Sequence, residues 1–530
     1  MATYPLPDPA DQYDVVVIGS GPAGGTLASK LAETGKRILL LERGDYLPRE
    51  RANWSSEEVF GRARYVAADT FYDSADKPFT PGMHAFVGGN SKVYGAALFR
   101  LRPEDFGEIR HHGGVSPAWP ISYDELEPYY VQAERMYLVH GKHGEDPFEG
   151  PFSADYAYPP VRHEPRIQLL SDALERLGLH PFHLPIGVDL TQDAAGRATH
   201  DSPCIRCDRV DGFPCLVDGK ADAEVVAVRP ALAAHPNLTL LTRTTARRLV
   251  TDAGGRTVSV VLATGPDGEQ RTFGGDIVVL SAGSILSAAL LLRSADDAHP
   301  HGLANGSDVV GRYYLRHNNV ALMAVSKDPN PTTFQKTLSL NDFYGPSKSW
   351  QYPMGNIQML GKSDDWQLKG EAPKMLRWGP AFTYEMAAKH SIDFWLAGED
   401  LPRPDSRVTV RADGAVRLSV PPDNNAEGVR RLRATLDSML SELGLQSKSF
   451  ERGLYLHKDM DVSATAHQAG TVRFGSAPAN SALDLDCKAH ELDNLYVVDG
   501  SFMPSIGAVN PTLTIIANAI RVSERIAARL

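Results

Sequence analysis

The chain has 530 residues, of which 42% are hydrophobic and 22% charged, as in an ordinary globular protein. This length exceeds what one hydrophobic core supports, so we expect two domains. The formal net charge is −11, with acidic and basic residues mixed along the whole length, which argues against a nucleic-acid partner. No run of about eighteen apolar residues is present, so we expect no membrane partner either.

Two further features bear on the cellular compartment. Residues 1–8 lack the basic region and the apolar core of a secretory signal. Four cysteines in a chain of this length do not make a disulfide framework, which fits a reducing compartment. We therefore expect a cytoplasmic protein.

In chain order, the first expected elements are a strand, a helix and a second strand. Residues 14–18 (DVVVI) form a β-branched apolar run, which is typical of a buried parallel strand. Residues 19–24 (GSGPAG) follow as a G-x-G-x-x-G motif, and a helical pattern extends over 23–34. A second apolar strand is expected over 37–41, closed by Glu42. Together these elements predict a dinucleotide-binding unit.

Each residue of this motif has a physical role in that unit. Gly19 makes the tight turn, Gly21 lets a pyrophosphate approach the backbone, and Gly24 lets the helix pack closely on the strand. The helix N-terminus favours the phosphate charge. Glu42 is placed to accept hydrogen bonds from the ribose hydroxyls. FAD and NAD share this motif, so it does not choose between them.

Three later segments repeat the pattern of small residues beside strands. Residues 86–96 (FVGGNSKVYGA) contain paired glycines that suit close approach to a phosphate or a flat ring, although such a loop is equally a structural turn. Residues 276–280 form a strand followed by a helix over 285–293. A last strand over 494–498 leads to residues 510–512 (NPT) and a terminal helix.

These segments carry a family resemblance. GSGPAGG, GGNSKVYGA, VVLSAGS, HQAGT and NLYVVDGSFMPSIGAVNPTLTIIANAI resemble, in order and over nearly the whole chain, a glucose–methanol–choline (GMC) oxidoreductase. The resemblance implies an α/β fold with a Rossmann-like FAD-binding domain and a second, sheet-based α+β substrate-binding domain, interleaved in sequence. We expect the FAD-binding domain over 1–110, 204–320 and 461–530. The substrate-binding domain and lid segments would then occupy 111–203 and 321–460.

The resemblance also implies the cofactor and its contacts. FAD is expected, and the residues expected to hold it are Gly19, Gly21, Gly24, Glu42, Gly88, Gly89, Asn90, Ser91, Asp499, Pro511 and Thr512. Several pyranose oxidases attach FAD through a histidine of the paired-glycine loop. No histidine lies between Gly88 and Arg100, and Val93 stands at or near that place. We therefore expect FAD to be bound without a covalent bond.

Oxidation of an alcohol needs a base for the hydroxyl proton, a role that histidine suits near neutral pH. The chain has seventeen histidines, so composition selects none of them. His467 matches the catalytic histidine of the family and Asn510 its partner, with His457 and His490 as alternatives. Asn510 also precedes Pro511, so it is expected to cap the terminal helix as well.

The substrate class follows from the middle of the chain. Residues 334–344 (FQKTLSLNDFY) and 355–362 (GNIQMLGK) resemble pyranose oxidases and bacterial FAD-dependent glycoside 3-oxidases, including C-glycoside oxidases. The resemblance implies oxidation of a secondary ring hydroxyl of a sugar or glycoside, with C3 favoured and C2 left open, and Gln335 and Asn341 as substrate contacts. O2 is the expected electron acceptor and H2O2 its product. A sugar dehydrogenase with another acceptor, or an oxidase of another alcohol class, is the alternative.

Other readings of the same features remain open. Cys204, Cys207 and Cys215 supply three thiols, but a closed zinc site needs four ligands and Cys487 is remote in sequence, so we expect a plain loop and no metal. Residues 407–420 predict a hairpin in the sheet that covers the substrate, and 141–160 and 329–353 predict long loops. A nicotinamide dehydrogenase, a lyase that keeps its flavin oxidised, and a non-catalytic flavin-binding module are the rival functions.

Overall fold

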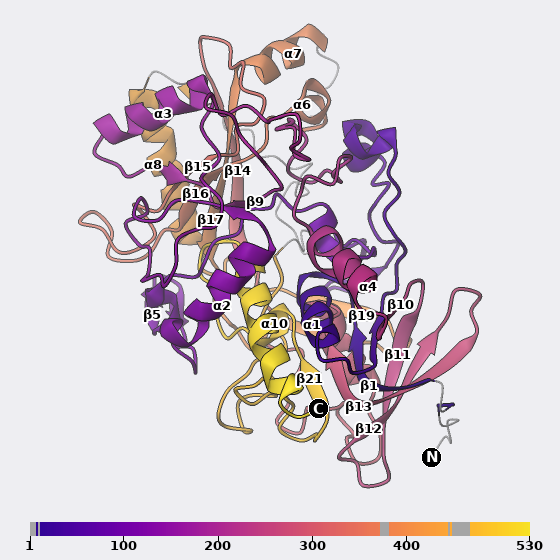
Figure 1. Cartoon of the computed structure of the whole chain (residues 1–530). Helices are drawn as coiled ribbons and strands as arrows, with labels where there is room; N and C mark the ends of the chain where they lie inside the picture. Colours follow the sequence, from indigo (N-terminus) through magenta and orange to yellow (C-terminus); the bar gives the residue numbers. More distant parts are fainter. Residues whose placement is uncertain (1–6, 9–10, 372–380, 444–445, 448–466) are drawn as a thin grey trace.

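Two large sheets organise the molecule (Figure 1). The computed structural model describes residues 7–8, 11–371, 381–443, 446–447 and 467–530. One sheet contains the N-terminal strand β1 (Gln12–Ile18), and the other contains β14 (His317–Val325) and β17 (Ser391–Glu399). The expected α/β fold with a second, sheet-based part is confirmed.

The first sheet has seven strands in the order β10-β2-β1-β13-β12-β11, with β21 paired to β13. Strands β10, β2, β1, β13 and β21 run parallel, whereas β13, β12 and β11 form an antiparallel extension. The bounds are β2 (Ile38–Leu41), β10 (Leu238–Leu241), β11 (Thr245–Thr251), β12 (Val258–Thr264), β13 (Gln270–Leu280) and β21 (Leu495–Val497).

Burial explains why β1 is the centre of this sheet. Val15, Val16 and Val17 have no exposed surface, because strands flank β1 on both sides and helices cover it. Helix α1 (Pro22–Ala32) packs against α10 (Thr512–Ala527), which also packs against α2 (Tyr123–Met136) (Figure 1). The N-terminal strand and helix are thus present as predicted, with boundaries that differ by one or two residues.

The second sheet has six strands in the order β20-β14-β17-β16-β15-β8 and is antiparallel. Its remaining strands are β8 (Phe182–His183), β15 (Leu338–Leu340), β16 (Asn356–Met359) and β20 (Gln446–Ser447). Helix α8 (Ala426–Glu442) packs on β14 and β17, and α3 (Pro165–Arg176) contributes Ile167, Leu170 and Leu174 to the same core. This separate core supports the division into two parts, whose exact boundaries stay a prediction.

The predicted hairpin exists, but its expected place was wrong. Strands β18 (Arg407–Val410) and β19 (Val416–Ser419) join β3 (Phe71–Tyr72) and β4 (Pro78–Phe79) in a separate four-stranded sheet. Strand β18 packs on α5 (Ser284–Arg293), which follows a strand of the first sheet. The alternating pattern predicted the hairpin itself but could not predict which strands pair with it.

The remaining elements are short. The long segment expected over 329–353 contains β15, so it is not a plain loop throughout. The other helices are α4 (Arg229–Ala234), α6 (Asp365–Glu371) and α7 (Ala381–His390). The two-stranded ladders are β5 (Ile109–His111) with β6 (Gly114–Ser116), and β7 (Val139–His140) with β9 (Ile186–Gly187). Single helical turns occupy Arg51–Trp54, Glu57–Gly61, Gly89–Lys92, Pro103–Phe106, Glu224–Val228 and Gly500–Phe502.

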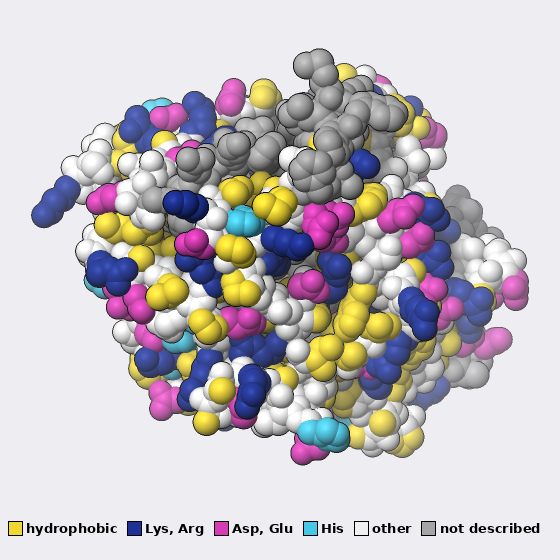
Figure 2. All heavy atoms as spheres, turned by 90° about the horizontal axis from the view of Figure 1, so that it is seen from above, with side chains coloured by type: hydrophobic (Ala, Val, Ile, Leu, Met, Phe, Trp, Pro, Cys, Tyr) yellow, Lys and Arg dark blue, Asp and Glu magenta, His cyan; other side chains and the backbone are white. Residues whose placement is uncertain are grey.

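On one face of the molecule, side chains of different kinds lie mixed among the described residues (Figure 2). Figure 2 shows basic, acidic and apolar side chains interspersed over the face seen from above. Among the described residues, no helix combines the length and the apolar character that crossing a bilayer requires.

Candidate active site

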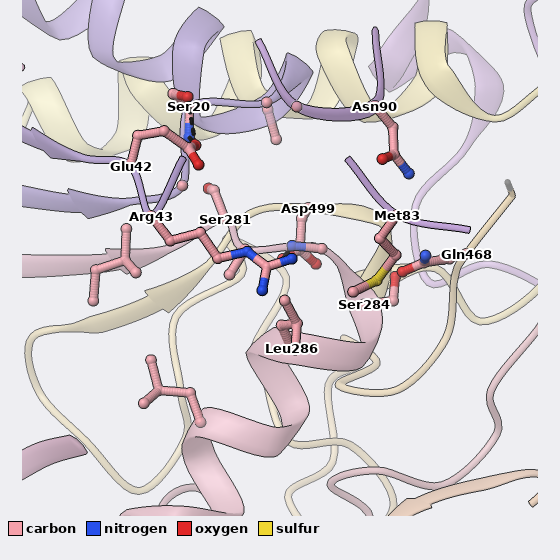
Figure 3. A pocket seen from close by; sticks show the side chains of 18 of the residues that line it. Ser20, Glu42, Arg43, Met83, Asn90, Ser281, Ser284, Leu286, Gln468 and Asp499 are labelled. Carbon is pink, nitrogen blue, oxygen red and sulfur yellow. Dashed lines mark hydrogen bonds between the residues drawn. The ribbon is translucent and has the colours of Figure 1, made fainter. Parts of the chain in front are cut away.

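A cavity of about 330 Å³ opens at the carboxyl ends of the parallel strands β1, β2 and β13 (Figure 3). Ser20, Glu42 and Arg43 lie at one end of it, and Met83, Asn90 and Gln468 lie at the other. A ligand site is expected at this edge of a doubly wound sheet. Of the residues predicted to bind the cofactor, those that line the cavity are Gly19, Gly21, Glu42, Gly89, Asn90, Asp499, Pro511 and Thr512.

Glycine stands at the three positions of the motif for different structural reasons. Gly19 has a φ of +106°, and a Cβ on Gly24 would lie 1.9 Å from the carbonyl oxygen of Gly19. These two positions therefore need glycine for the protein's own turn and packing. Gly21 has a φ of −67°, and a Cβ there would be 4.0 Å from its nearest neighbour, the Gly89 Cα. The fold itself leaves room for a side chain at Gly21, so the glycine suits the close approach of a ligand at the N-terminus of α1.

Glu42 is held at the end of β2 by three donors. Its Oε2 accepts hydrogen bonds from the Ser20 amide at 3.1 Å and the Ser20 hydroxyl at 2.6 Å (Figure 3). Its Oε1 accepts from the Gly44 amide at 2.8 Å. The side chain is buried yet lines the cavity. Oε2 uses both of its acceptor positions on Ser20, whereas Oε1 uses one and can accept a further bond, so Glu42 fits the recognition of a ribose hydroxyl.

The paired-glycine loop crosses the cavity beside Gly21. Asn90 Oδ1 accepts a hydrogen bond from the His84 amide at 3.0 Å, which directs its amide group. Ser91 Oγ donates to the Gly88 carbonyl at 2.6 Å and accepts from the Ala223 amide at 3.0 Å. Gly88 and Ser91 do not line the cavity, so they shape the loop, while Gly89 and Asn90 form its wall.

Asp499 and the start of α10 form the far wall. Asp499 Oδ2 accepts hydrogen bonds from the Gly283 amide at 3.0 Å and the Ser287 hydroxyl at 2.6 Å. Burial raises the pKa of this carboxyl above its ordinary value, and these donors oppose the shift. Pro511 and Thr512 place the N-terminus of α10 at the cavity. Helix N-termini at both ends therefore favour a ligand that carries negative charge.

His467 and Asn510 lie together, as the family motif predicted. Asn510 Nδ2 is 3.3 Å from His467 Nε2, and its Oδ1 accepts a hydrogen bond from Gln358 Nε2 at 2.8 Å. The expected capping role of Asn510 was wrong: α10 begins at Thr512, its N-cap residue is Pro511, and no side chain caps it. The side chain of Asn510 is engaged on His467 and Gln358 instead.

A residue that the sequence did not single out completes this centre. His317, the first residue of β14, has its Nδ1 2.7 Å from His467 Nδ1 and its Nε2 3.0 Å from the Gly507 carbonyl oxygen. It is 2% exposed. Its sequence context, a histidine before the run 318–325, resembles many strand starts, so no local signal distinguishes it.

Burial controls the protonation of both histidines. It holds the pKa of His467 well below the ordinary 6.5, and the charges of His317 and Lys336 act in the same direction. Burial also lowers the pKa of His317 to about 4, against the opposing charge of Glu399. Lys336 forms an ion pair with Asp211. Both imidazoles are therefore neutral near pH 7, and a neutral imidazole can accept a proton.

Comparison with known proteins identifies the family. Two family models, both described as GMC oxidoreductase, match residues 14–318 and 402–519. The chain belongs to the GMC oxidoreductase family. As a GMC oxidoreductase it acts on CH–OH groups, and its cofactor is FAD. The cavity fits this cofactor, since it offers a glycine turn at the N-terminus of α1, the buried carboxylate of Glu42 and the N-terminus of α10.

Individual relatives of this GMC oxidoreductase cover nearly the whole chain. It is 32% identical over 545 residues to 6'''-hydroxyparomomycin C oxidase of Streptomyces lividus, covering 99% of this chain and 93% of that protein. It is 31% identical over 533 residues to paromamine 6'-oxidase of Streptomyces fradiae, with 98% and 92% covered. Its fold is similar to that of pyridoxine 4-oxidase from Mesorbium loti, with a TM-score of 0.66, 19% identity and coverage of 97% and 99%.

The two predicted substrate contacts lie inside the protein. Gln335 Nε2 donates to Asp393 Oδ2 at 3.0 Å, and Gln335 Oε1 accepts from Asn330 at 3.2 Å. Asn341 Nδ2 donates to Asp146 at 2.7 Å, and Asn341 Oδ1 accepts from Asn356 at 2.8 Å. Neither side chain has exposed surface. Asn341 nevertheless connects to the pair of His467 and Asn510, because Asn356 also accepts a hydrogen bond from Gln358 at 3.0 Å, and Gln358 donates to Asn510.

The remaining candidates lie elsewhere. Within the described ranges no group of three or more His, Cys, Asp or Glu side chains is arranged to hold a metal ion. Burial raises the pKa of the Cys204 thiol to about 12, which disfavours the thiolate that a metal needs. Of the alternative bases, His457 lies outside the described residues, and His490 Nε2 contacts Ser481 and the Gly475 carbonyl.

Proposed function

We propose that this GMC oxidoreductase oxidises a secondary ring hydroxyl of a sugar or glycoside, with C3 favoured, and that His467 is the base. The observation that carries the proposal is the neutral His467 beside Asn510, whose chain neighbours Pro511 and Thr512 line the cofactor cavity. At this position His467 is next to the cofactor cavity, where the flavin would accept the electrons. FAD bound without a covalent bond supplies the hydride acceptor, flavin N5.

The side chains divide the work of proton removal. His467 Nε2 takes the hydroxyl proton as the C–H bond breaks. Asn510 Nδ2 donates a hydrogen bond to the same substrate oxygen, which gains negative charge as the proton leaves. The N-terminus of α10 adds positive potential on the side of the cofactor.

The substrate class rests on two supports. Residues 334–344 and 355–362 resemble glycoside 3-oxidases, and they contribute β15 and β16 beside the catalytic centre. Two relatives more than 30% identical to this chain are aminoglycoside oxidases, named for 6'''-hydroxyparomomycin C and paromamine, which supports a sugar-like substrate. Both names contain the word oxidase, which supports O2 as the electron acceptor; a dehydrogenase with another acceptor remains the alternative.

A second candidate is oxidation of the exocyclic 6-hydroxyl of an amino sugar. The name paromamine 6'-oxidase supports this candidate, since the alignment with that relative covers 98% of this chain. The two candidates share the base and the cofactor. They differ only in which carbon faces His467.

Matched deoxy substrates separate the candidates. Anaerobic mixing of the holoenzyme with methyl glucoside, its 3-deoxy analogue and its 6-deoxy analogue would be followed by flavin absorbance. Oxidation at C3 predicts bleaching by the 6-deoxy analogue and none by the 3-deoxy analogue, and oxidation at C6 predicts the reverse. Paromamine and choline extend the panel. Bleaching by choline alone would contradict the sugar assignment, and absence of bleaching by any alcohol would support a lyase or a non-catalytic module.

The acceptor is tested on the reduced enzyme. If the chain is an oxidase, mixing the sugar-reduced protein with O2 restores flavin absorbance and produces one H2O2 per flavin. Reoxidation by a quinone or a dye with none by O2 would assign a dehydrogenase.

A further inference from the structure

His317 lies behind His467, on the side away from Asn510. It begins β14, opposite Glu399 of β17, and its ring is almost fully buried. The two imidazole planes are nearly perpendicular, at 88°, with ring centroids 4.9 Å apart. The Nδ1 atoms of the two rings are 2.7 Å apart, so one of them donates a hydrogen bond to the other.

The second nitrogen of His317 decides the direction of that bond. His317 Nε2 is 3.0 Å from the Gly507 carbonyl oxygen, which can only accept, so Nε2 carries the proton. A neutral imidazole has one N–H, and His317 Nδ1 is therefore the acceptor. His467 Nδ1 must then be the donor, which leaves a lone pair on His467 Nε2.

The opposite side of His467 agrees with this assignment. Asn510 Oδ1 accepts from Gln358 Nε2, so the amide nitrogen of Asn510 faces His467 Nε2 at 3.3 Å. An amide nitrogen donates, and it fits a nitrogen with a lone pair. A proton on His467 Nε2 would place two donors against each other. In the hydrogen-bonded series that links the Gly507 carbonyl, His317, His467, Asn510 and Gln358, each side-chain nitrogen thus acts either as a donor or as an acceptor without conflict.

We propose that His317 is a positioning residue that holds neutral His467 in the tautomer with its proton on Nδ1 and its lone pair on Nε2. The catalytic consequence rests on the proposed role of His467 as the base. A neutral partner has a specific effect: it orients the base and accepts from Nδ1, yet it adds no negative charge that would favour a protonated His467 in the resting enzyme.

The groups that surround His317 keep it in this state. Glu399 Oε1 accepts hydrogen bonds from the Gly507 amide at 3.0 Å and the Ile506 amide at 3.3 Å, which hold the Gly507 carbonyl against His317. Glu399 is in turn paired with His111, at 3.0 Å between Oε2 and Nε2. On the side of His467, the charged groups are Lys336 and its partner Asp211. The carboxylate nearest to His317 is thus engaged with backbone amides and His111.

The tautomer can be measured without turnover. Ring 15N shifts of histidine-labelled holoenzyme at pH 7.5, with His467→Ala and His317→Asn used for assignment, report which nitrogen of His467 carries the proton. We expect a protonated Nδ1 and an unprotonated Nε2 in the parent. A protonated Nε2 on His467, or a proton on both nitrogens, would overturn the proposal.

Three substitutions at 317 extend the test to the reaction. His317→Asn keeps an acceptor for His467 Nδ1, and we expect flavin reduction within about 5-fold of the parent. His317→Leu removes the acceptor, and the rate should fall by at least about 10-fold, part of the 10²–10⁴-fold that a general base supplies. In His317→Asp the carboxylate favours protonated His467, so the acid limb of the pH–rate profile should move to higher pH. An unshifted limb in a folded His317→Asp protein would count against the proposal.

His140→Leu is the matched control, because His140 is also buried and also contacts a backbone carbonyl, that of Pro159 at 2.6 Å. Its loss should lower the melting temperature and leave the pH profile unchanged. If His140→Leu slows reduction as much as His317→Leu, the effect at 317 is structural and the proposal fails. A parent-like rate in His467→Ala, with the expected 15N shifts, would instead refute His467 as the base and leave the tautomer assignment intact.

Discussion

Gln358 Nε2 donates a hydrogen bond to Asn510 Oδ1 at 2.8 Å and thereby directs the amide nitrogen of Asn510 toward His467. Gln358 comes from β16 in the second sheet, whereas Asn510 precedes the terminal helix that packs on the first. The pair of His467 and Asn510, which we propose to be catalytic, is therefore oriented by a contact between the two parts of the fold. Asn356 and Asn341 extend this contact as a buried chain of amides.

We predict that Gln358→Leu slows anaerobic flavin reduction by roughly 10-fold, because the Asn510 amide is no longer directed and one transition-state hydrogen bond is lost. Unfolding free energy should also fall by about 1–3 kcal/mol, since the Asn356 and Asn510 oxygens lose a donor. Gln367→Leu is the control, as Gln367 is equally buried and its Oε1 accepts from the Asp364 amide at 3.0 Å. It should lose stability only. Equal reduction rates in Gln358→Leu and the parent would contradict this role.

Gly21 and Gly24 give a matched pair for the cofactor site. A Cβ at Gly21 meets nothing closer than 4.0 Å, so Gly21→Ala should melt as apoprotein within about 0.5 kcal/mol of the parent, yet bind FAD weakly. A Cβ at Gly24 would lie 1.9 Å from the Gly19 carbonyl oxygen, so Gly24→Ala should destabilise the apoprotein itself by about 1–3 kcal/mol or more. Thermal melts of the apoproteins and FAD titrations separate the two. If Gly21→Ala binds FAD as tightly as the parent does, the pyrophosphate does not bind at this turn.

The sequence predicted the cofactor half of the fold well, for a physical reason. The strand at 12–18, the motif at 19–24 and the helix that follows are specified by local signals: β-branched apolar residues, glycines and a proline at the helix start. Glu42 was expected at the cavity because it closes the second strand of this unit, and Asn90 because of the family resemblance of its loop; both line the cavity.

The parts that depend on pairing between strands far apart in the sequence, and on side-chain contacts, could not be predicted. The hairpin at 407–420 was recognised, but its partner strands β3 and β4 lie more than 300 residues away in sequence. His317 is a further case, because only the fold brings residue 317 against residue 467. Asn510 was expected to cap a helix, since the sequence cannot show that Gln358 donates a hydrogen bond to its side-chain oxygen.

We predict that the flavin is released when the yellow holoenzyme is precipitated with acid. By the resemblance to pyranose oxidases, Val93 stands at or near the place where several of them carry a tethering histidine, and no histidine lies between Gly88 and Arg100. The measurement is the flavin absorbance of supernatant and pellet, with a denaturing gel scanned for flavin fluorescence as a second readout. Flavin that remains in the acid pellet would contradict non-covalent binding.

We predict that flavin reduction shows no inflection at pH 6.5, the ordinary histidine pKa. Burial holds the pKa of His467 well below that value, so the base stays deprotonated from neutral pH down to distinctly lower pH. The rate should fall only when His467 becomes protonated, that is, as the pH drops through its lowered pKa. Stopped-flow reduction across pH 5–9, with stability checked at each pH, gives the profile. An acid limb at or above pH 6.5 would show that the base does not have the lowered pKa of His467, or that another group limits the reaction.

The strongest prediction separates the two members of the catalytic pair. His467→Ala should still bind FAD, because His467 does not line the cofactor cavity, and its flavin reduction should fall by about 10²–10⁴-fold. Asn510→Ala should lose less, since one hydrogen bond to the substrate oxygen disappears while the base remains. Because α10 has no side-chain cap, Asn510→Ala should lose stability only through two side-chain contacts: the Gln358 donor, which keeps Asn356 as a partner, and His467 Nε2, which loses a donor at 3.3 Å. We therefore expect a loss of about 1 kcal/mol. Both losses should appear in the reduction step rather than in substrate binding, since the base acts in the transition state. Anaerobic reduction rates at saturating sugar, FAD content and thermal melts of the two variants measure these effects. A His467→Ala protein that reduces its flavin at nearly the parent rate would remove the base assignment and direct attention to the other histidines.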